Sequence, residues 1–389
     1  MPSPIHHLLQ QTGSSGGLGG VLNSAEFIAA LRDLGAGVVD TALDRGVVPA
    51  TFTRSTAAAS KLSTGLWKLD VASGSPRSSY IGLTTAVGTY GGYLAEGQRT
   101  NLCIQSRDST NVAWTNTSIT AAKTSTGIDG VTNSCSRLTA TGANGTSLQA
   151  ITVASAAKTF SVWIKRVTGT GNIFITLDND ATRTDVTASI NSATFTLVQM
   201  TQTLANPTVG IKIATSTDAI DVDIAQLEDT ASFASTPIPT TTVAVTRNTD
   251  LLTYPSSGNV LGTSGSAYAE ATAPTASIQT EVISTRSGNL SLIGRSSLAA
   301  FIFDGTSTQN VGTWNTTALA KVASSWGGAT MSILFNGSVA GVAFDGDMNV
   351  AGLAIGNDLG GGRAFFGTIK NVHLWMTKLS DAALQSLTT

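Results

Sequence analysis

Histidine, on which most nucleophilic catalysis and many metal sites depend, occurs at only three of the 389 positions. His6 and His7 lie in a terminal stretch that turns Gly/Ser-rich, and His373 alternates with Trp375 along a predicted strand. Ser-His-Asp or Cys-His catalysis would therefore have to use His373, and a site with several histidine ligands is excluded. We expect a surface or interface role for His373.

Carboxylate pairs, which glycosidases need at a defined separation, are scarce. Glu270 and Glu281 are the only glutamates after residue 247. Asp221 and Asp223 share one face of a predicted strand, and Glu228 is the nearest glutamate. A dyad assembled from distant strands would still allow polysaccharide hydrolysis, which stays an alternative. The expectation is a protein that is not an enzyme and needs no cofactor.

Asp345, Asp347 and Asn349 have the alternate spacing of oxygen ligands in a calcium loop. The glycine and the terminal glutamate that complete such a loop are missing, so these residues are weak metal candidates and a polar turn is expected. Cys103 and Cys135 fit neither a disulfide scaffold nor a zinc spacing. Two buried thiols are expected, and a single bridge between them stays open.

Exposed aromatic rings would suit a sugar ligand, because a pyranose face stacks on an indole. Most tryptophans in β-sandwiches belong to the core instead. Trp163 shares its predicted strand face with Ser161 and Lys165, which makes it the best candidate platform. Trp163, Lys165 and Trp326 are therefore the candidate glycan-binding residues.

The composition points to strands rather than helices. Charged residues make up 12%, about half the usual share of ~25%, and Thr, Ser, Ala and 40 glycines take their place. Small and β-branched residues suit pleated strands and tight turns. The net charge of −2 argues against nucleic-acid binding. No apolar stretch reaches the ~18 residues that span a bilayer, and the first residues lack the features of a secretory signal, so we expect assembly in a cytoplasm.

The elements divide the chain into four stretches. Residues 1–48 are predicted to be an arm followed by a short helix, capped by Asn23 or Ser24, with Phe27, Leu31 and Leu34 on one face and Gly35 at its end. Residues 49–100 are predicted to be a β anchoring segment. Residues 101–247 and 248–389 alternate apolar and polar positions in many short runs, which indicates two sandwiches. Glu96 and Arg99, at the seam, are predicted to form an ion pair.

The middle of the chain resembles the conserved lead-in and first module of many bacteriophage tail and head-fibre proteins. The lead-in is matched by residues 52–57 (FTRSTA), 76–77 (PR) and 94–102 (LAEGQRTNL). The end of the module is matched by residues 226–228 (QLE) and 233–240 (FASTPIPT), where Pro237 replaces the usual aromatic residue. The resemblance implies a jelly roll like that of carbohydrate-binding modules over residues 101–247.

The last stretch resembles the concanavalin A-like, laminin-G-type sandwich. The matching residues are 326–328 (WGG), 333–337 (ILFNG) and the closing strand and helix at 366–384. Asn336-Gly337 is by itself a strong hairpin signal. The resemblance places a cap at Ser380 and docking contacts at Leu384 and Leu387.

Together these observations predict a mainly β protein with two tandem β-sandwich jelly rolls behind an N-terminal arm, short helix and β anchoring segment. The resemblance implies a bacteriophage virion structural protein, in a head or tail fibre or decoration, that displays lectin-like modules for adhesion to host-surface glycans. It would contact capsid, portal or tail proteins through residues 1–100 and form a homo-oligomer, with a trimer favoured because avidity multiplies weak binding. A purely structural decoration without a ligand is the alternative. Neither nucleic acid nor membrane insertion is expected.

Overall fold

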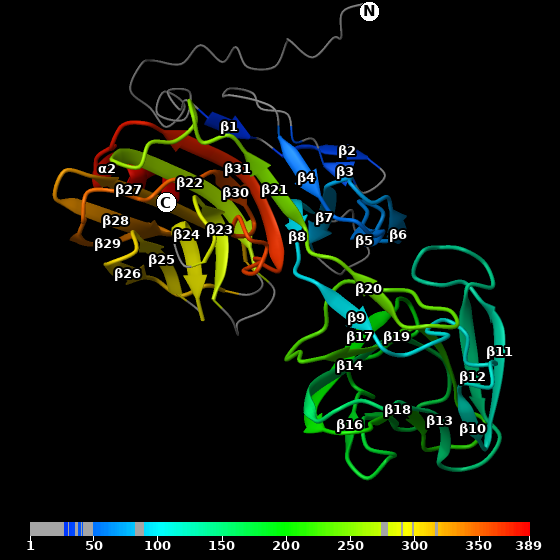
Figure 1. Ribbon diagram of the computed structural model, residues 1–389. Coiled ribbons are helices and arrows are strands. Elements are labelled where there is room, and N and C mark those ends of the chain that lie inside the picture. Colours follow the sequence, from blue (N-terminus) through cyan, green and yellow to red (C-terminus); the bar gives the residue numbers. More distant parts are fainter. Residues whose placement is uncertain are drawn as a thin grey trace, which may run out of the picture.

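The computed structural model describes residues 27–29, 31–35, 38–39, 41, 50–81, 89–273, 279–288, 291–297, 299–315 and 318–389. These residues form antiparallel β-sheets arranged as two sandwiches, which appear as two lobes in Figure 1. The described part of the chain contains one helix, α2 (Asp381–Thr388). The prediction of a mainly β fold with sandwich-type units is confirmed.

The first sandwich lies between residues 99 and 247. Its five-stranded sheet contains, in spatial order, β10 (Thr115–Thr117), β13 (Gly145–Ala150), β18 (Thr208–Ile213), β15 (Ile173–Thr176) and β16 (Arg183–Asp185). Its second sheet contains β11 (Ile119–Ser125), β12 (Cys135–Ala140), β19 (Ala219–Asp229), β14 (Ala156–Thr168) and β17 (Thr196–Leu204), with β9 (Arg99–Asn101) and β20 (Val245–Arg247) joined to it through β19.

Strand β14 shows why this sequence forms a sandwich. Phe160, Val162 and Ile164 lie in the core between the two sheets, while Trp163 and Lys165 point to the other face. This period of two is what a strand buried on one face requires. The predicted alternation in this strand is confirmed.

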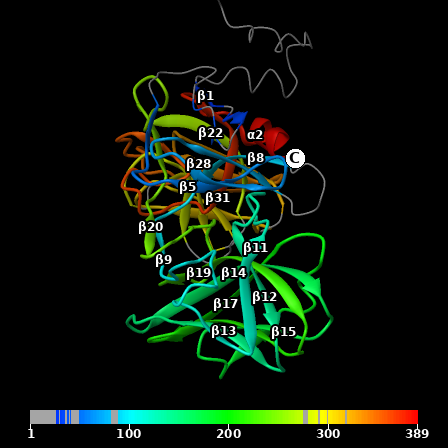
Figure 2. The same cartoon turned by 90° about the vertical axis from the view of Figure 1, so that its right-hand side faces the viewer.

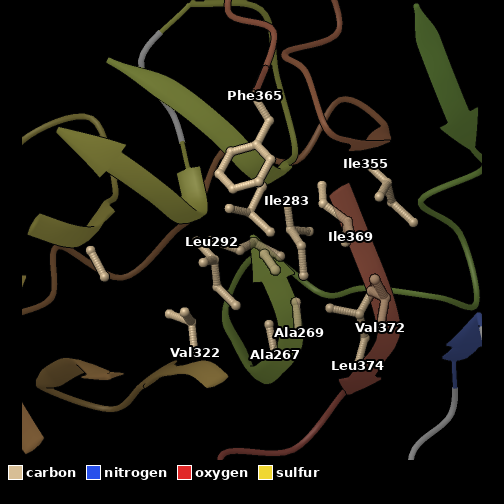
Figure 3. Close-up of a cluster of buried hydrophobic side chains, with 14 of the residues drawn as sticks. Ala267, Ala269, Ile283, Leu292, Val322, Ile355, Phe365, Ile369, Val372 and Leu374 are labelled. Atoms are coloured by element: carbon tan, nitrogen blue, oxygen red, sulfur yellow. The ribbon is translucent and has the colours of Figure 1, made fainter. Parts of the chain in front are cut away.

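The second sandwich contains a ten-stranded and a seven-stranded sheet. The first contains β2 (Asp33–Gly35), β3 (Val38–Val39), β7 (Arg77–Ile81), β8 (Thr89–Ala95), β31 (Gly367–Trp375), β22 (Ser264–Thr272), β27 (Ala320–Gly327), β28 (Thr330–Phe335) and β29 (Ser338–Ala343), with β1 (Phe27–Ala29) on β31. The second contains β26 (Thr308–Val311), β25 (Ala299–Phe303), β24 (Ser291–Ser296), β23 (Thr280–Ser284), β30 (Leu353–Ile355), β21 (Leu251–Tyr254) and β4 (Thr51–Thr53). Figure 3 shows side chains from both sheets, such as Val322 of β27 and Ile355 of β30, in one buried cluster.

The strands of the predicted anchoring segment lie in the sheets of the second sandwich. β4 pairs with β21, and β8 pairs with β31. The chain therefore leaves the second sandwich through β9, builds the first sandwich, and returns through β20. β9 and β20 pair with each other, with Arg99 opposite Arg247, and both lie at the junction of the two lobes (Figures 1 and 2). The four-part division of the chain stays a prediction, but strand pairing ties residues 51–95 to the last stretch.

The helix expected near residues 27–35 is wrong. Phe27–Ala29 forms a strand whose backbone pairs with β31, and Asp33–Gly35 forms another. Leu31 has a φ of 48°, a left-handed conformation that a right-handed helix cannot contain. A helix this short is not stable by itself, so a strand that pairs with an existing sheet is the more stable structure here. The predicted caps and the arm over residues 1–22 lie outside the described residues.

Two local predictions for the second sandwich are confirmed. Asn336 and Gly337 join β28 to β29 with φ values of 44° and 84°, as a tight primed turn requires. Ser380 accepts a hydrogen bond from the backbone N–H of Ala383 and caps α2, and Leu384 and Leu387 are buried against the sheet.

Both cysteines are free thiols. Cys103 and Cys135 are buried. Burial raises the pKa of the Cys135 thiol to about 12, and it raises the pKa of the Cys103 thiol as well. The prediction of two buried thiols is confirmed, and neither is a reactive nucleophile at neutral pH.

Candidate functional site

The three predicted glycan-binding residues do not form one site. Trp163 and Lys165 belong to β14 of the first sandwich, whereas Trp326 belongs to β27 of the second. Trp326 is fully buried, and its indole N–H donates to the carbonyl of Leu261 at 2.9 Å. A ring with no exposed face cannot stack on a sugar, so Trp326 is a core residue.

Trp163 and Lys165 are also engaged by neighbouring side chains. Trp163 is only 6% exposed because Trp67 packs against it edge to face, with ring centroids 5.7 Å apart. Lys165 pairs with Asp221 at 3.4 Å and lies over the ring of Phe195 at 5.0 Å. The prediction that Trp163 and Lys165 share one strand face is confirmed, but Trp163 is not an exposed platform. Trp67, which covers it, belongs to a hairpin nearly 100 residues earlier in the chain.

The weak metal candidates form a polar turn. The carboxylate of Asp345 accepts from the backbone N–H of Asp347 at 3.2 Å, and that of Asp347 accepts from the N–H of Asn349 at 2.9 Å. These contacts use oxygens that a calcium ion would need. In the described part of the chain, no three residues among His, Cys, Asp and Glu are grouped to hold a metal ion.

A cavity of about 720 Å³ lies between a hairpin and the first sandwich. We call it the junction groove. The hairpin consists of β5 (Ala58–Lys61) and β6 (Trp67–Val71), and it lies on the side of the second lobe that faces the first (Figure 1). The groove is lined by Ala57, Ala58, Leu62, Trp67, Lys68, Leu69, Asp70, Arg107, Asp129, Val131, Pro237, Ile238, Pro239, Val245 and Arg247.

The hairpin wall is held in place by backbone and aromatic contacts. Leu62 and Leu66 close its turn with a hydrogen bond of 2.9 Å, and Gly65 takes the φ of 82° that the turn needs. The N–H of Trp67 donates to the carbonyl of Ile128 at 3.0 Å, across to the first sandwich. Trp67 remains partly exposed and borders the groove, so it is the aromatic residue available to a ligand.

The opposite wall is organised by Arg107. Its Nε and Nη2 donate to the two oxygens of Asp223 at 2.8 and 2.9 Å, and its Nη1 donates to Asp129 at 2.7 Å. Burial alone would raise the pKa of Asp129, but the hydrogen bonds from Arg107, Val131 and Ser134 and the charge of Arg107 together lower it. Asp129 is therefore a carboxylate at neutral pH. The bidentate geometry fixes the guanidinium plane.

The floor of the groove reaches a buried ionic cluster at the junction of the sandwiches. We call it the seam cluster: Arg54, Arg77, Glu96, Arg247 and Asp250. Arg54 pairs with Asp250 at 2.8 Å, and Arg77 pairs with Glu96 at 2.9 Å and with the second oxygen of Asp250. Arg247, which lines the groove, pairs with Glu96 at 3.0 Å.

Further hydrogen bonds complete the environment of Glu96. Thr236 donates to it from its backbone N–H at 3.0 Å and from its hydroxyl at 2.6 Å. Burial would raise the pKa of Glu96, but Arg247, Arg77 and these hydrogen bonds lower it to about 2. The cluster thus joins β7 and β8 of the second sandwich to the end of the first.

The predicted ion pair between Glu96 and Arg99 is wrong. The Nε of Arg99 lies 3.6 Å from Glu228, and its guanidinium lies over the rings of Phe233 and Phe366, at 5.1 and 4.7 Å. Arg99 begins β9, which pairs with β19, the strand that carries Glu228. The sheet therefore directs Arg99 away from Glu96.

The sequence singled out part of the seam cluster, but it did not single out the residues of the groove. Arg54, Arg77 and Glu96 all belong to the quoted lead-in stretches, and the structure brings them together. Trp67, Arg107 and Asp129 belong to no motif and meet only because the hairpin packs on the first sandwich. No pattern in the sequence alone could have selected them.

Comparisons with known proteins return similarities of fold only. No family model and no curated protein matches the sequence. Among solved structures, the CBM40 of the Ruminococcus gnavus IT-sialidase bound to α2,3-sialyllactose is 14% identical, with 35% of this chain and 92% of that chain covered and a TM-score of 0.29. Domain 4 of AbnA, an extracellular arabinanase from Geobacillus stearothermophilus in complex with arabinotriose, is 12% identical, with 36% and 73% covered and a TM-score of 0.30.

The Trypanosoma rangeli sialidase in complex with 2,3-difluorosialic acid is 13% identical, with a TM-score of 0.30. The match covers 36% of this chain and 26% of that chain. At such scores these likenesses carry no argument about the function of this protein. Among the described residues, no helix is long and apolar enough to span a bilayer.

Proposed function

We propose that this protein is a structural component of a bacteriophage particle and that it binds glycans through the junction groove. The groove carries the proposal. Its volume of about 720 Å³ falls within the range of about 300–1,000 Å³ usual for small-molecule sites. It combines the partly exposed ring of Trp67 with fixed polar groups such as Arg107 and Asp129, and sugars need both an apolar surface and oriented hydrogen-bonding partners.

The proposed place on a phage particle is supported by a sequence resemblance. Residues 52–57, 76–77 and 94–102 resemble the lead-in of bacteriophage tail and head-fibre proteins. Arg54, Arg77 and Glu96, which belong to these stretches, all lie in the seam cluster. The residues that carry the resemblance therefore help to form the junction of the two sandwiches. The proposal includes assembly in the host cytoplasm, contact with other virion proteins through residues 1–100, and a homo-oligomeric state. Light scattering of the purified protein would measure the oligomer number, and antibody labelling of the particle would locate it on head or tail.

The proposal is one of binding without catalysis. A glycosidase needs one carboxyl group that stays protonated near neutral pH and a second that is ionised. Asp129 lines the groove, but its pKa is lowered and Arg107 occupies one of its oxygens. It is poorly suited to donate a proton to a leaving group.

A glycan array with the full chain tests the proposal. Val131 borders the groove and is 55% exposed, so Val131→Trp should fill the groove without disturbing the core. Val112, 98% exposed and outside the groove, supplies the matched control Val112→Trp. We expect the wild type and Val112→Trp to bind bacterial surface polysaccharides and Val131→Trp to lose at least tenfold in affinity. Equal binding by both variants would move the site elsewhere, and a blank array would favour a purely structural decoration.

A further inference from the structure

We infer that the junction groove selects uncharged glycans and rejects acidic ones, an inference that rests on the proposed function. The evidence is the state of the charged side chains that line the groove. These are Lys68, Asp70, Arg107, Asp129 and Arg247. Each of them already has an oppositely charged partner within ion-pair distance.

The rim pair is Lys68 with Asp70. The ammonium of Lys68 lies 2.7 Å from the carboxylate of Asp70, and both residues border the groove. The pair contributes a positive and a negative charge side by side, so it presents hydrogen-bonding groups without a net charge. A hydroxyl group can bridge such a pair, because it both donates and accepts.

The charged groups of the wall and the floor are held by more partners. Arg107 directs four donor contacts to Asp223, Asp129 and Ser134. Arg247 donates to Thr236 and to the carbonyl of Gly97, in addition to its ion pair with Glu96. An acidic sugar would have to displace a protein carboxylate to reach either guanidinium, and that would leave a buried or half-buried carboxylate without its partner.

The remaining lining is apolar. Trp67, Leu69, Pro237 and Ile238 bring carbon surface to the cavity. Apolar surface together with charged groups that already have partners matches the C–H faces and hydroxyl edges of a neutral oligosaccharide. A carboxylated or phosphorylated sugar would lose its hydration here without finding a free cation.

The test uses the full chain, a broad array of bacterial and plant polysaccharides, and calorimetry at two salt concentrations. The neutral probes include dextran, mannan, galactan and arabinan oligosaccharides, and the acidic probes include oligogalacturonate and polysialic acid. We expect neutral probes to bind with affinities that change less than about twofold between low and high salt, because an uncharged ligand forms no ion pair that salt could screen. Binding restricted to acidic probes, with affinity that falls steeply as salt rises, would overturn the inference and leave the proposed function standing. Binding to no probe at all would overturn the proposed function itself.

A single substitution should convert the selectivity. In Asp129→Asn, the Oδ1 position can still accept from the N–H of Val131 and the hydroxyl of Ser134, so the loop should keep its shape. Nη1 of Arg107 loses its carboxylate partner and the groove gains one positive charge. We expect this variant to bind oligogalacturonate at least tenfold more tightly than the wild type does. Asp108→Asn, which also removes a surface carboxylate of the first sandwich but lies outside the groove lining, is the control and should gain nothing. If Asp129→Asn gains no acidic ligand while it remains folded, the inference is wrong.

Discussion

Glu96 links several of the buried groups at the junction of the two sandwiches. Its carboxylate is buried and faces Arg77 and Arg247, while its own backbone N–H donates to Asp250 at 3.0 Å. The seam cluster holds three arginines and two carboxylates, so loss of one carboxylate would leave buried positive charges uncompensated. Removing one partner from a buried ionic group typically costs about 3–5 kcal/mol.

Glu96→Gln should therefore lower the free energy of unfolding by about 3–5 kcal/mol. The pKa of Glu96 is lowered to about 2. The stability that this carboxylate contributes is thus complete above about pH 4.5 and is lost as the pH falls towards 2. Urea unfolding of the wild type and the variant from pH 3 to 7 should show a difference that shrinks at the acid end. Asp70→Asn, at an exposed pair, should change stability by less than about 1 kcal/mol at every pH.

A second buried carboxylate, Glu281 in β23, gives the opposite pH dependence. Both of its oxygens are buried and lack a hydrogen bond of normal geometry among the described residues, and burial raises its pKa to about 8 against the smaller opposing effects of Ser291 and Arg363. The folded protein therefore binds an extra proton between about pH 4.5 and 8, and this group makes stability fall as the pH rises through that window.

Glu281→Gln removes this ionisation. The variant should gain stability relative to the wild type as the pH rises from about 4.5 to 8, by up to about 1.4 kcal/mol for each unit. Thermal unfolding across this range measures the difference. Glu270→Gln, at a partly buried pair with Lys370, is the control and should show no such slope. A gain for Glu281→Gln that does not vary with pH would contradict the assignment.

At the scale of elements, the β5–β6 hairpin forms one wall of the groove and contacts the first sandwich mainly through Trp67. Trp67 contacts Trp163 and donates from its backbone N–H to Ile128, and Leu69 of the hairpin packs against the same buried cluster. Edge-to-face aromatic pairs contribute about 0.5–1.5 kcal/mol in addition to the area they bury. Trp67 is therefore a main contact between the hairpin and the first sandwich.

Trp67→Ala should loosen the hairpin while both sandwiches stay folded. Hydrogen exchange should quicken at the backbone amides of residues 58–71 by about tenfold or more, and exchange in β14 and β22 should stay unchanged. Asp70→Ala, in the same hairpin but without the ring contact, should leave these rates within about twofold of the wild type. Global loss of protection would mean that Trp67 supports a whole sandwich rather than the hairpin.

Elements that depend on a local pattern could be predicted from the sequence. Features that depend on contacts between distant residues could not. The alternation in β14, the Asn336-Gly337 turn and the Ser380 cap each depend on neighbouring residues, and all three were predicted correctly. The spacing of Phe27, Leu31 and Leu34 is also a local pattern, and it predicts a helix. Phe27–Ala29 instead forms a strand because its backbone pairs with β31. The burial of Trp163 depends on Trp67, and the pairing of Glu96 depends on Arg247, about 150 residues away. Single-sequence patterns contain neither fact.

At the scale of the whole molecule, strand pairing indicates that the first sandwich is an insertion into the second. Its first and last strands, β9 and β20, pair with each other, so its ends lie side by side. The second sandwich takes strands from both sides of the insertion, such as β8 and β31. The seam cluster lies at this junction, where the chain passes between the two sandwiches twice.

An excision experiment follows from this topology. A fragment of residues 98–248 should fold cooperatively, because its core and its paired ends are intact. A fragment of residues 248–389 should not fold, because β8 and β4 would be missing from its sheets. Circular dichroism and thermal melts of the two fragments measure this. A cooperative melt for residues 248–389 alone would contradict the insertion.

The central claim is that a glycan occupies the junction groove. Hydrogen exchange of the full chain, with and without a saturating neutral oligosaccharide chosen from the array, locates the ligand directly. We predict slower exchange at residues 62–70, 129–131 and 238. Exchange should stay unchanged in β26 and β29, which contribute no residue to the groove. Protection confined to the second sandwich, or none despite saturation, would contradict the account.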